Sequence, residues 1–177
     1  MRSVTFGCAT SLDGFIARAD HSTDWLRWND EVAALSNALW STVDAVVMGR
    51  KTYEVAVRAG TTAYPGVANY VCSRTLARAP DPAVVVVSEE AVDFVDRLKR
   101  SAGRGICVMG GGELGTALLA AGLVDRVGLN VHPILLGSGI PLFHPISESV
   151  QLRLEQTTPL PGGCVYLLYR VGGPTEA

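Results

Sequence analysis

The sequence shows little excess of charge of either sign and no long apolar run. Its 177 residues carry 15 basic and 17 acidic side chains, which gives a formal net charge of −2. A charge so close to zero provides no electrostatic attraction toward nucleic acid or an anionic membrane. No apolar stretch approaches the roughly 20 residues of a membrane-spanning helix, and the N-terminus lacks the pattern of a secretion signal. We therefore expect a cytoplasmic globular protein that binds neither nucleic acid nor membrane.

Closely spaced metal-binding residues are also missing. The four cysteines are Cys8, Cys72, Cys107 and Cys164, and the three histidines are His21, His132 and His144. Zinc sites and redox dithiols need close pairs of such residues, and none occurs. The sequence also lacks the GxSxG motif of serine hydrolases. We therefore expect reduced thiols, no bound metal and no covalent hydrolysis.

Short apolar runs alternate with helical patterns along most of the chain. The expected strands are Val4–Ala9, Ala45–Met48, Asn69–Cys72, Val84–Val87, Ile106–Met109 and Arg126–Val131. The expected helices follow Asn29 and Ser88 as capping residues, or span Thr52–Arg58 and Glu113–Ala121. Continuously apolar runs such as VVVV are typical of parallel strands that are covered on both faces. The alternation predicts an α/β fold, with a mostly parallel central sheet between helices.

The end of the chain has a different pattern. Apolar and polar residues alternate from Val150 to Glu155, and an apolar run at Cys164–Val171 follows a Pro-Gly-Gly turn. This pattern predicts an antiparallel C-terminal ribbon that completes the sheet. The length fits a single domain, which we expect at residues 1–171, with residues 172–177 as a tail.

Two of the expected strand ends carry groups that favour a bound anion. After Met48 a helix is expected to start at Gly49-Arg50-Lys51-Thr52, where cations oppose the helix dipole by about 0.3–1 kcal/mol each. A bound anion would remove this conflict, although a single exposed Arg-Lys pair is also tolerable. At the second strand end, Ser73-Arg74-Thr75 offers two hydroxyls and a guanidinium, which suit a phosphate monoester or form a solvated loop.

The third strand end is rich in glycine. Gly110-Gly111-Gly112-Glu113-Leu114-Gly115 satisfies GxGxxG between a strand and a helix. A Rossmann fold would also need an acidic residue about 20 residues further on, and none is present. The glycines still permit close approach of the backbone to a ligand, or a tight turn. Three phosphate-binding strand ends fit NADPH better than NADH, because only NADPH adds a 2′-phosphate to the diphosphate.

These motifs resemble the dihydrofolate reductase-like family over nearly the whole chain. VVMGRKTYE is similar to its phosphate-binding strand–helix motif, and VMGGGELG resembles its glycine-rich turn. The opening CATSLDGFIA, followed by Asp24-Trp25-Leu26, is closer to the branch that contains the reductase domain of the riboflavin-pathway deaminase-reductase. The resemblance implies a three-layer dihydrofolate reductase-like fold and a cis peptide bond at Gly110-Gly111.

The resemblance also implies the residues that bind the cofactor. It assigns the diphosphate and adenosine end to Gly49, Arg50, Lys51 and Thr52, and the 2′-phosphate to Ser73 and Arg74. It assigns the diphosphate and nicotinamide ribose to Gly110, Gly111, Gly112, Glu113 and Leu114, and the nicotinamide ring to Ala9 and Ile16.

The catalytic carboxylate of the family has no direct counterpart here. In folate reductases it falls near Ala33, and Glu31 is a nearby carboxylate about one turn out of register. The riboflavin-pathway reductases have a glutamate where this chain has Met109. The candidate catalytic residues are therefore Glu31 and Asp13, which either assists the substrate or forms an ordinary Asp-Gly turn.

Three further residues are candidates for substrate binding. Trp25 and Trp28 either form a flat wall for an aromatic substrate or fill the core over the first helix. Asn130 lies near the pocket-facing threonine of folate reductases, where it orients a substrate or satisfies a neighbouring strand.

The sequence as a whole predicts an NADPH-dependent reductase. It would transfer a hydride to the C=N or C=O bond of a small planar heterocycle, pterin- or pyrimidine-like, or of a carbonyl compound. One alternative is the riboflavin-pathway 5-amino-6-(5-phosphoribosylamino)uracil reductase, and another is a non-catalytic NADPH-binding sensor. We also expect a homodimer that pairs through the sheet edge or the C-terminal ribbon.

Overall fold

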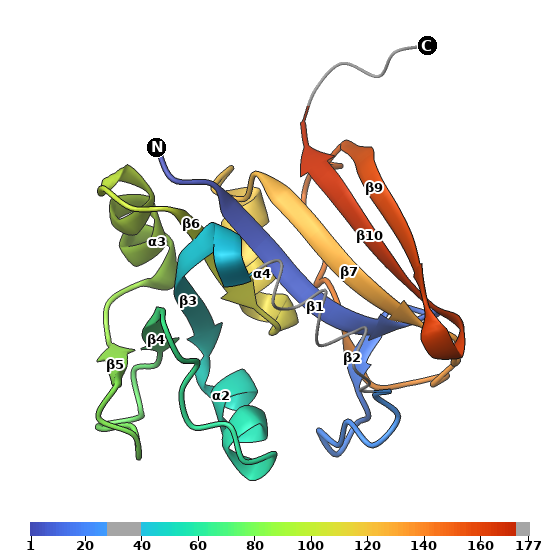
Figure 1. The fold of residues 1–177 in the computed structure, drawn as a ribbon, viewed down its shortest axis with the longest axis horizontal. Helices are drawn as coiled ribbons and strands as arrows, with labels where there is room; N and C mark the ends of the chain where they lie inside the picture. Colours follow the sequence, from blue (N-terminus) through green and yellow to red (C-terminus); the bar gives the residue numbers. More distant parts are fainter. Residues whose placement is uncertain (28–39, 173–177) are drawn as a thin grey trace.

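The computed structural model describes residues 1–27 and 40–172 (Figure 1). The strands are β1 (Val4–Ser11), β2 (Phe15–Ala17), β3 (Val43–Gly49), β4 (Ala68–Cys72), β5 (Val84–Val87), β6 (Gly105–Met109), β7 (Arg126–His132), β8 (Ile140–Pro141), β9 (Leu152–Leu160) and β10 (Cys164–Val171). The helices are α2 (Arg50–Arg58), α3 (Ala91–Arg100), α4 (Gly112–Ala120) and the short 3-10 turn η1 (Pro161–Gly163).

Within these residues, eight strands form one sheet in the order β5-β4-β3-β6-β1-β7-β10-β9. The first six strands of this order run parallel to one another, whereas β10 is antiparallel to both β7 and β9. The predicted α/β class, the mostly parallel sheet and the antiparallel C-terminal ribbon are therefore confirmed. The pair β2 and β8 forms a separate small sheet that the sequence did not predict, because two or three residues carry no readable periodicity.

Helices cover both faces of the sheet, as the continuously apolar strands require. On one face, Val46 and Met48 of β3 pack in a core with Tyr53 of α2. On the other face, Val47 of β3 lies in the core that contains Phe94 of α3 and Leu118 of α4. Figure 1 shows α4 behind β1 in this view. The result is three layers, in which α2, α3 and α4 each follow the carboxyl end of a parallel strand.

The starts of all three described α-helices differ from the expected ranges by one or two residues, and α4 begins at Gly112 rather than Glu113. Helix α2 begins at Arg50 rather than Thr52, because Gly49 is still extended (φ −77°, ψ 160°) and the helix follows at once. Ser88 does not cap α3: the N-cap is Glu90, with extended backbone, and the first helical residue is Ala91. The helix expected after Asn29 lies outside the described residues, as does the expected tail from residue 173 onward.

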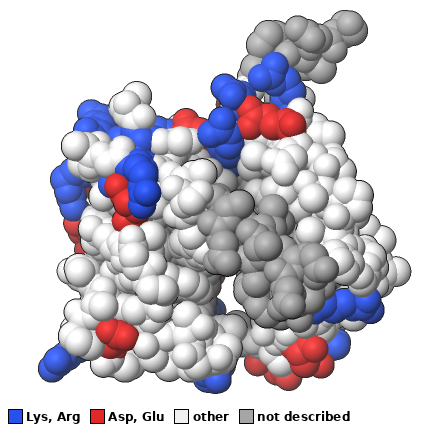
Figure 2. All heavy atoms as spheres, in the orientation of Figure 1, with Lys and Arg blue, Asp and Glu red and all other residues white. Residues whose placement is uncertain are grey.

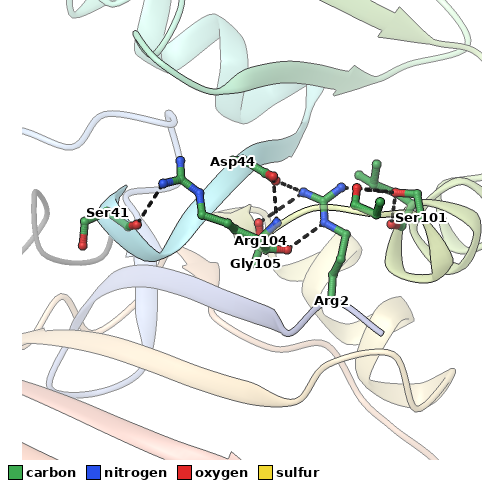
Figure 3. A network of polar contacts seen from close by, with 8 residues as sticks. Arg2, Ser41, Asp44, Ser101, Arg104 and Gly105 are labelled. Carbon is green, nitrogen blue, oxygen red and sulfur yellow. Dashed lines mark hydrogen bonds and ion pairs between the residues drawn. The ribbon is translucent and has the colours of Figure 1, made fainter.

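The amino ends of three central strands are joined by a polar network (Figure 3). The Arg2 guanidinium, only 5% exposed, forms an ion pair with Asp44 of β3 and donates to the Arg104 carbonyl at 2.8 Å. The second Asp44 oxygen accepts the backbone N–H of Arg104 at 2.7 Å, just before β6. This network ties β1, β3 and β6 together at the end of the sheet opposite the carboxyl ends.

Charges of both signs are mixed on the face of the molecule that Figure 2 draws. In Figure 2, the basic and acidic side chains of the described residues adjoin one another, and large areas of this face carry neither. This distribution agrees with the net charge of −2. An anion would therefore have to be bound by a local group of residues, because this face has no broad positive surface.

Candidate functional site

The carboxyl ends of β1, β3, β4 and β6 open into one cleft of about 730 Å³. This is the position where open α/β sheets bind ligands. The cleft is lined by all thirteen residues that the resemblance assigned to the cofactor: Ala9, Ile16, Gly49, Arg50, Lys51, Thr52, Ser73, Arg74, Gly110, Gly111, Gly112, Glu113 and Leu114. The three predicted strand ends thus share one groove, while the cofactor-binding role of each residue stays a prediction.

Three helices begin at this cleft, and their N-termini are uncapped. The N-cap residues are Gly49 for α2, Glu90 for α3 and Gly111 for α4, and none of them makes a side-chain capping hydrogen bond. The first turn of each helix therefore presents backbone N–H groups that have no partner within the helix. Free N–H groups and the positive end of the helix dipole together favour an anion.

The two cations of the first motif have different surroundings. Arg50 donates from Nη1 to Glu54 Oε1 at 2.6 Å, one turn further along α2, so its charge is balanced by a neighbour. Lys51 is exposed and forms no ion pair within the described residues. The expected conflict with the helix dipole therefore applies to Lys51 alone.

The glycine-rich turn packs against α2. Gly110 and Gly111 have φ angles of 54° and 70°, which side chains rarely tolerate. A Cβ on Gly110 would lie 3.0 Å from the Thr52 methyl group, so the turn and the first turn of α2 are in close contact. The cis peptide bond implied at Gly110-Gly111 is wrong: within the described residues every peptide bond is trans. Two consecutive positive φ angles reverse the chain without it.

Gly112, the first residue of α4, has no room for a side chain. A Cβ there would lie 2.5 Å from the Pro141 carbonyl oxygen and 3.3 Å from the His144 ring. The His144 backbone N–H donates to Thr116 Oγ1 at 2.9 Å, which fixes this segment on α4. His144 consequently lines the cleft, although the sequence reasoning missed it. No local pattern identifies it, because only the return of the chain after β8 brings it there.

The turn after β4 is ordered by a serine and faces two glutamates. Ser73 Oγ accepts the backbone N–H of Leu76 at 2.9 Å. Arg74 Nη1 donates to Glu90 Oε1 at 3.1 Å, and the adjacent Glu89 accepts two hydrogen bonds from Arg97, which lower the pKa of Glu89. Glu89 and Glu90 both line the cleft. From the sequence, both glutamates were expected only as residues of a helix start.

Two of the lining residues are cysteines without nucleophilic character. Burial raises the pKa of the Cys8 thiol to about 12, and that of Cys72 to about 11. At neutral pH both side chains are therefore thiols, not thiolates, and the thiolate is the reactive form. All four cysteines of the chain are free.

Asp13 lies outside the lining of the cleft and is held in a loop contact. Its carboxylate accepts hydrogen bonds from Ser11 Oγ at 2.6 Å and from the backbone N–H groups of Leu136 and Gly137 at 3.1 and 2.7 Å. The Ser11 bond is the main cause of the lowered pKa of Asp13. This side chain ties the turn after β1 to the loop after β7, and its catalytic role stays a prediction.

Trp25 and Asn130, two of the candidate substrate residues, are not among the residues that line the cleft. Trp25 is buried and packs edge-on against His132, with ring centroids 5.2 Å apart. Asn130 of β7 is the register partner of Ala9 in β1. Trp25 Nε1 and Asn130 Oδ1 are both buried, and neither has a hydrogen-bond partner among residues 1–27 and 40–172. Trp28 and Glu31 lie outside the described residues.

The described residues contain neither a metal-binding cluster nor a membrane-spanning helix. No three His, Cys, Asp or Glu side chains come together in an arrangement that could hold a metal ion. None of the helices there has the length and apolar character needed to cross a membrane.

Comparison with known proteins agrees with this architecture. The family model of the RibD C-terminal domain matches residues 2–166. The uncharacterized protein YwjB of Bacillus subtilis (strain 168) is 37% identical over 158 residues, which cover 88% of this chain and 91% of YwjB.

Solved structures share the fold over almost the whole chain. A candidate riboflavin biosynthesis protein from Shewanella sp. PV-4 has a TM-score of 0.84 and 25% identity, covering 97% of this chain and 99% of that one. A pyrimidine reductase-like protein from Corynebacterium diphtheriae has a TM-score of 0.74 and 19% identity, covering 98% and 93%. The chain belongs to the RibD C-terminal domain family and has the dihydrofolate reductase-like fold that its motifs resemble.

Proposed function

We propose that this protein is an NADPH-dependent reductase that transfers a hydride to a small planar heterocycle, pterin- or pyrimidine-like, or to a carbonyl compound. The observation that carries the proposal is the convergence of three uncapped helix N-termini on one cleft, together with Arg50, Lys51 and Arg74. A dinucleotide with a diphosphate and a separate monophosphate has anionic groups for all three helix starts.

The family to which the chain belongs indicates an oxidoreductase that uses a nicotinamide cofactor. The lining residues fit such a cofactor. In our proposal, the first turn of α2 and the glycine turn hold the diphosphate, and Ser73 and Arg74 hold the 2′-phosphate. Ala9 and Ile16 supply an apolar surface for the nicotinamide ring. NADPH, when bound, supplies the hydride, and the protein supplies orientation and exclusion of water.

No carboxylate among the described lining residues lies on the strands that form the proposed nicotinamide site. The carboxylates among the lining residues are Glu89, Glu90 and Glu113, and all three lie at the starts of α3 and α4. None lies on β1 or β2, which carry Ala9 and Ile16. We propose that water or the substrate itself provides the proton.

The proposed substrate is a heterocycle that carries hydrogen-bond donors. Asn130 lies opposite Ala9 in the register of β1 and β7, and its Oδ1 has no hydrogen-bond partner within the described part of the chain. A ring N–H or amino group of a pyrimidine-like compound would satisfy this oxygen, and a buried acceptor without a partner is otherwise costly. Similarity to a candidate riboflavin biosynthesis protein supports this class of substrate.

Binding and turnover test the proposal in sequence. NADPH at a hundred times its Kd should raise the free energy of unfolding by about 2.7 kcal/mol, visible as a higher thermal midpoint. Absence of any rise at millimolar NADPH would refute the proposal. Oxidation of NADPH, followed by its absorbance, should then occur with a member of a panel of pterins, pyrimidines and carbonyl compounds. Tight binding without oxidation across the panel would instead identify a non-catalytic NADPH-binding protein.

A further inference from the structure

The adenosine end of the cleft contains an ion pair that the proposed function does not use. Strands β4 and β5 are parallel neighbours with Cys72 opposite Val87, so the segments that follow them leave the sheet side by side. Arg74 from the first segment donates to Glu90 from the second at 3.1 Å. Both residues line the cleft, and their side chains are 78% and 67% exposed.

Glu90 is the carboxylate of this end that remains available to a ligand. Its neighbour Glu89 accepts two hydrogen bonds from Arg97, at 2.7 and 2.5 Å, which neutralise it. Glu90 has Arg74 as its ion-pair partner and makes no capping hydrogen bond to α3. The guanidinium proposed to bind a 2′-phosphate is thus already paired with an anion.

An exposed pair of this kind is weak and easily exchanged. A phosphate dianion is a stronger partner for a guanidinium than a carboxylate is, so a 2′-phosphate can take Arg74 from Glu90. A ribose 2′-hydroxyl cannot do so, because it carries no charge. It can instead donate a hydrogen bond to Glu90, as carboxylates do at the ribose of NAD in other dinucleotide sites.

We propose that Glu90 determines cofactor specificity at this end of the cleft. It competes with the 2′-phosphate of NADPH for Arg74, and it accepts a hydrogen bond from the 2′-hydroxyl of NADH, which has no 2′-phosphate. The protein therefore binds both NADPH and NADH. It binds NADPH more tightly, and the Glu90 carboxylate makes the difference between the two affinities smaller. This inference rests on the proposed function, since it takes the cleft to be a dinucleotide site.

The test is to measure the Kd of NADPH and of NADH by calorimetry for the wild type and for Glu90→Gln. The variant removes one negative charge several ångströms from a phosphate dianion. The Kd of NADPH should therefore fall about fivefold at low salt, and by less at high salt. Because the variant loses a charged hydrogen-bond acceptor, the Kd of NADH should rise about threefold. The two changes have opposite signs, which a general loosening of the protein cannot produce.

Asp96→Asn is the matched control. Asp96 lies on the same helix, is paired with Arg100 and does not line the cleft. This variant removes the same charge from α3 and should leave both affinities unchanged. If Asp96→Asn changed the two Kd values as much as Glu90→Gln does, the net charge of the protein and not the position of Glu90 would be the cause. That result would overturn the proposal.

The remaining outcomes separate this inference from the function on which it depends. If wild-type protein binds NADPH while Glu90→Gln changes both affinities in the same direction, or neither, the role of Glu90 is overturned and the reductase proposal stands. If the wild type binds neither dinucleotide, both proposals fail. Thermal midpoints of the two variants verify that each is folded.

Discussion

Gly112 provides the sharpest test of the link between the glycine-rich turn and cofactor binding. In Gly112→Ala, the new Cβ would lie 2.5 Å from the Pro141 carbonyl oxygen and 2.9 Å from that of Leu142. Both are backbone atoms, so the start of α4 must move away from the segment around β8. We expect this movement to displace the first N–H groups of α4 from the cleft.

The size of the effect on stability follows from overpacking. Inserting a methyl group into a well-packed contact costs about 1–3 kcal/mol, and the better helix propensity of alanine returns up to about 1 kcal/mol. A net loss of about 1–2 kcal/mol in a domain of this size lowers the thermal midpoint by roughly 2–8 °C. The variant therefore remains folded at 25 °C, where its affinity for NADPH can be measured.

Gly115→Ala is the control for Gly112→Ala. Gly115 lies on the same helix, and its Cβ would lie 2.5 Å from the fully buried ring of Phe6 on the core side. Gly115 does not line the cleft. Both variants should lose similar stability in urea denaturation. Only Gly112→Ala should raise the Kd of NADPH, measured by calorimetry, by tenfold or more, which corresponds to roughly 1.4 kcal/mol. Equal NADPH affinities in the two variants would refute the placement of a phosphate at the start of α4.

Three further predictions concern residues outside the cleft. Asp44→Ala leaves the buried Arg2 guanidinium without its carboxylate. It should cost about 3 kcal/mol in urea denaturation, with NADPH affinity unchanged, and a weakened affinity would mean that the network acts on the cleft. Arg126 and then Arg170 lower the pKa of Glu155 by hydrogen bonding. The stability that Glu155 contributes is therefore complete above its unfolded pKa and lost as the pH falls through the folded pKa. Between about pH 5 and 3, the urea concentration at the unfolding midpoint should fall less for Glu155→Gln than for the wild type. An equal fall in both proteins would contradict this. Asp13→Ala should lower the thermal midpoint but leave kcat nearly unchanged, whereas a fall of about a hundredfold or more would identify Asp13 as an acid–base catalyst.

The sequence was sufficient to predict the central sheet, because its strands are continuous apolar runs. Val84–Val87 was predicted at both ends, and Ile106–Met109 is one residue shorter than the observed β6. The shared cleft was also predictable, since parallel strands of one sheet bring their carboxyl ends to the same edge. Such inferences need only the order of the elements, and the sequence contains that order.

Contacts between distant segments could not be predicted in the same way. His144 reaches the cleft because the chain after β8 crosses Gly112. Glu90 reaches it because α3 starts two residues later than Ser88 would allow. A boundary error of this size is ordinary for single-sequence reasoning. Here it decides whether a carboxylate faces Arg74 or solvent.

The structure also changes the physical argument for anion binding. Anion binding was predicted from Arg50 and Lys51, which oppose a helix dipole, and from Arg74 in the next motif, but Arg50 is paired with Glu54 and Arg74 with Glu90. Only the conflict of Lys51 with the helix dipole remains, because these pairs balance the charges of both arginines without any ligand. They do not relieve the backbone N–H groups at the starts of α2, α3 and α4, because no capping side chain accepts from them. The strongest reason for an anion in this cleft is therefore the backbone, and the arginines determine which anion is preferred.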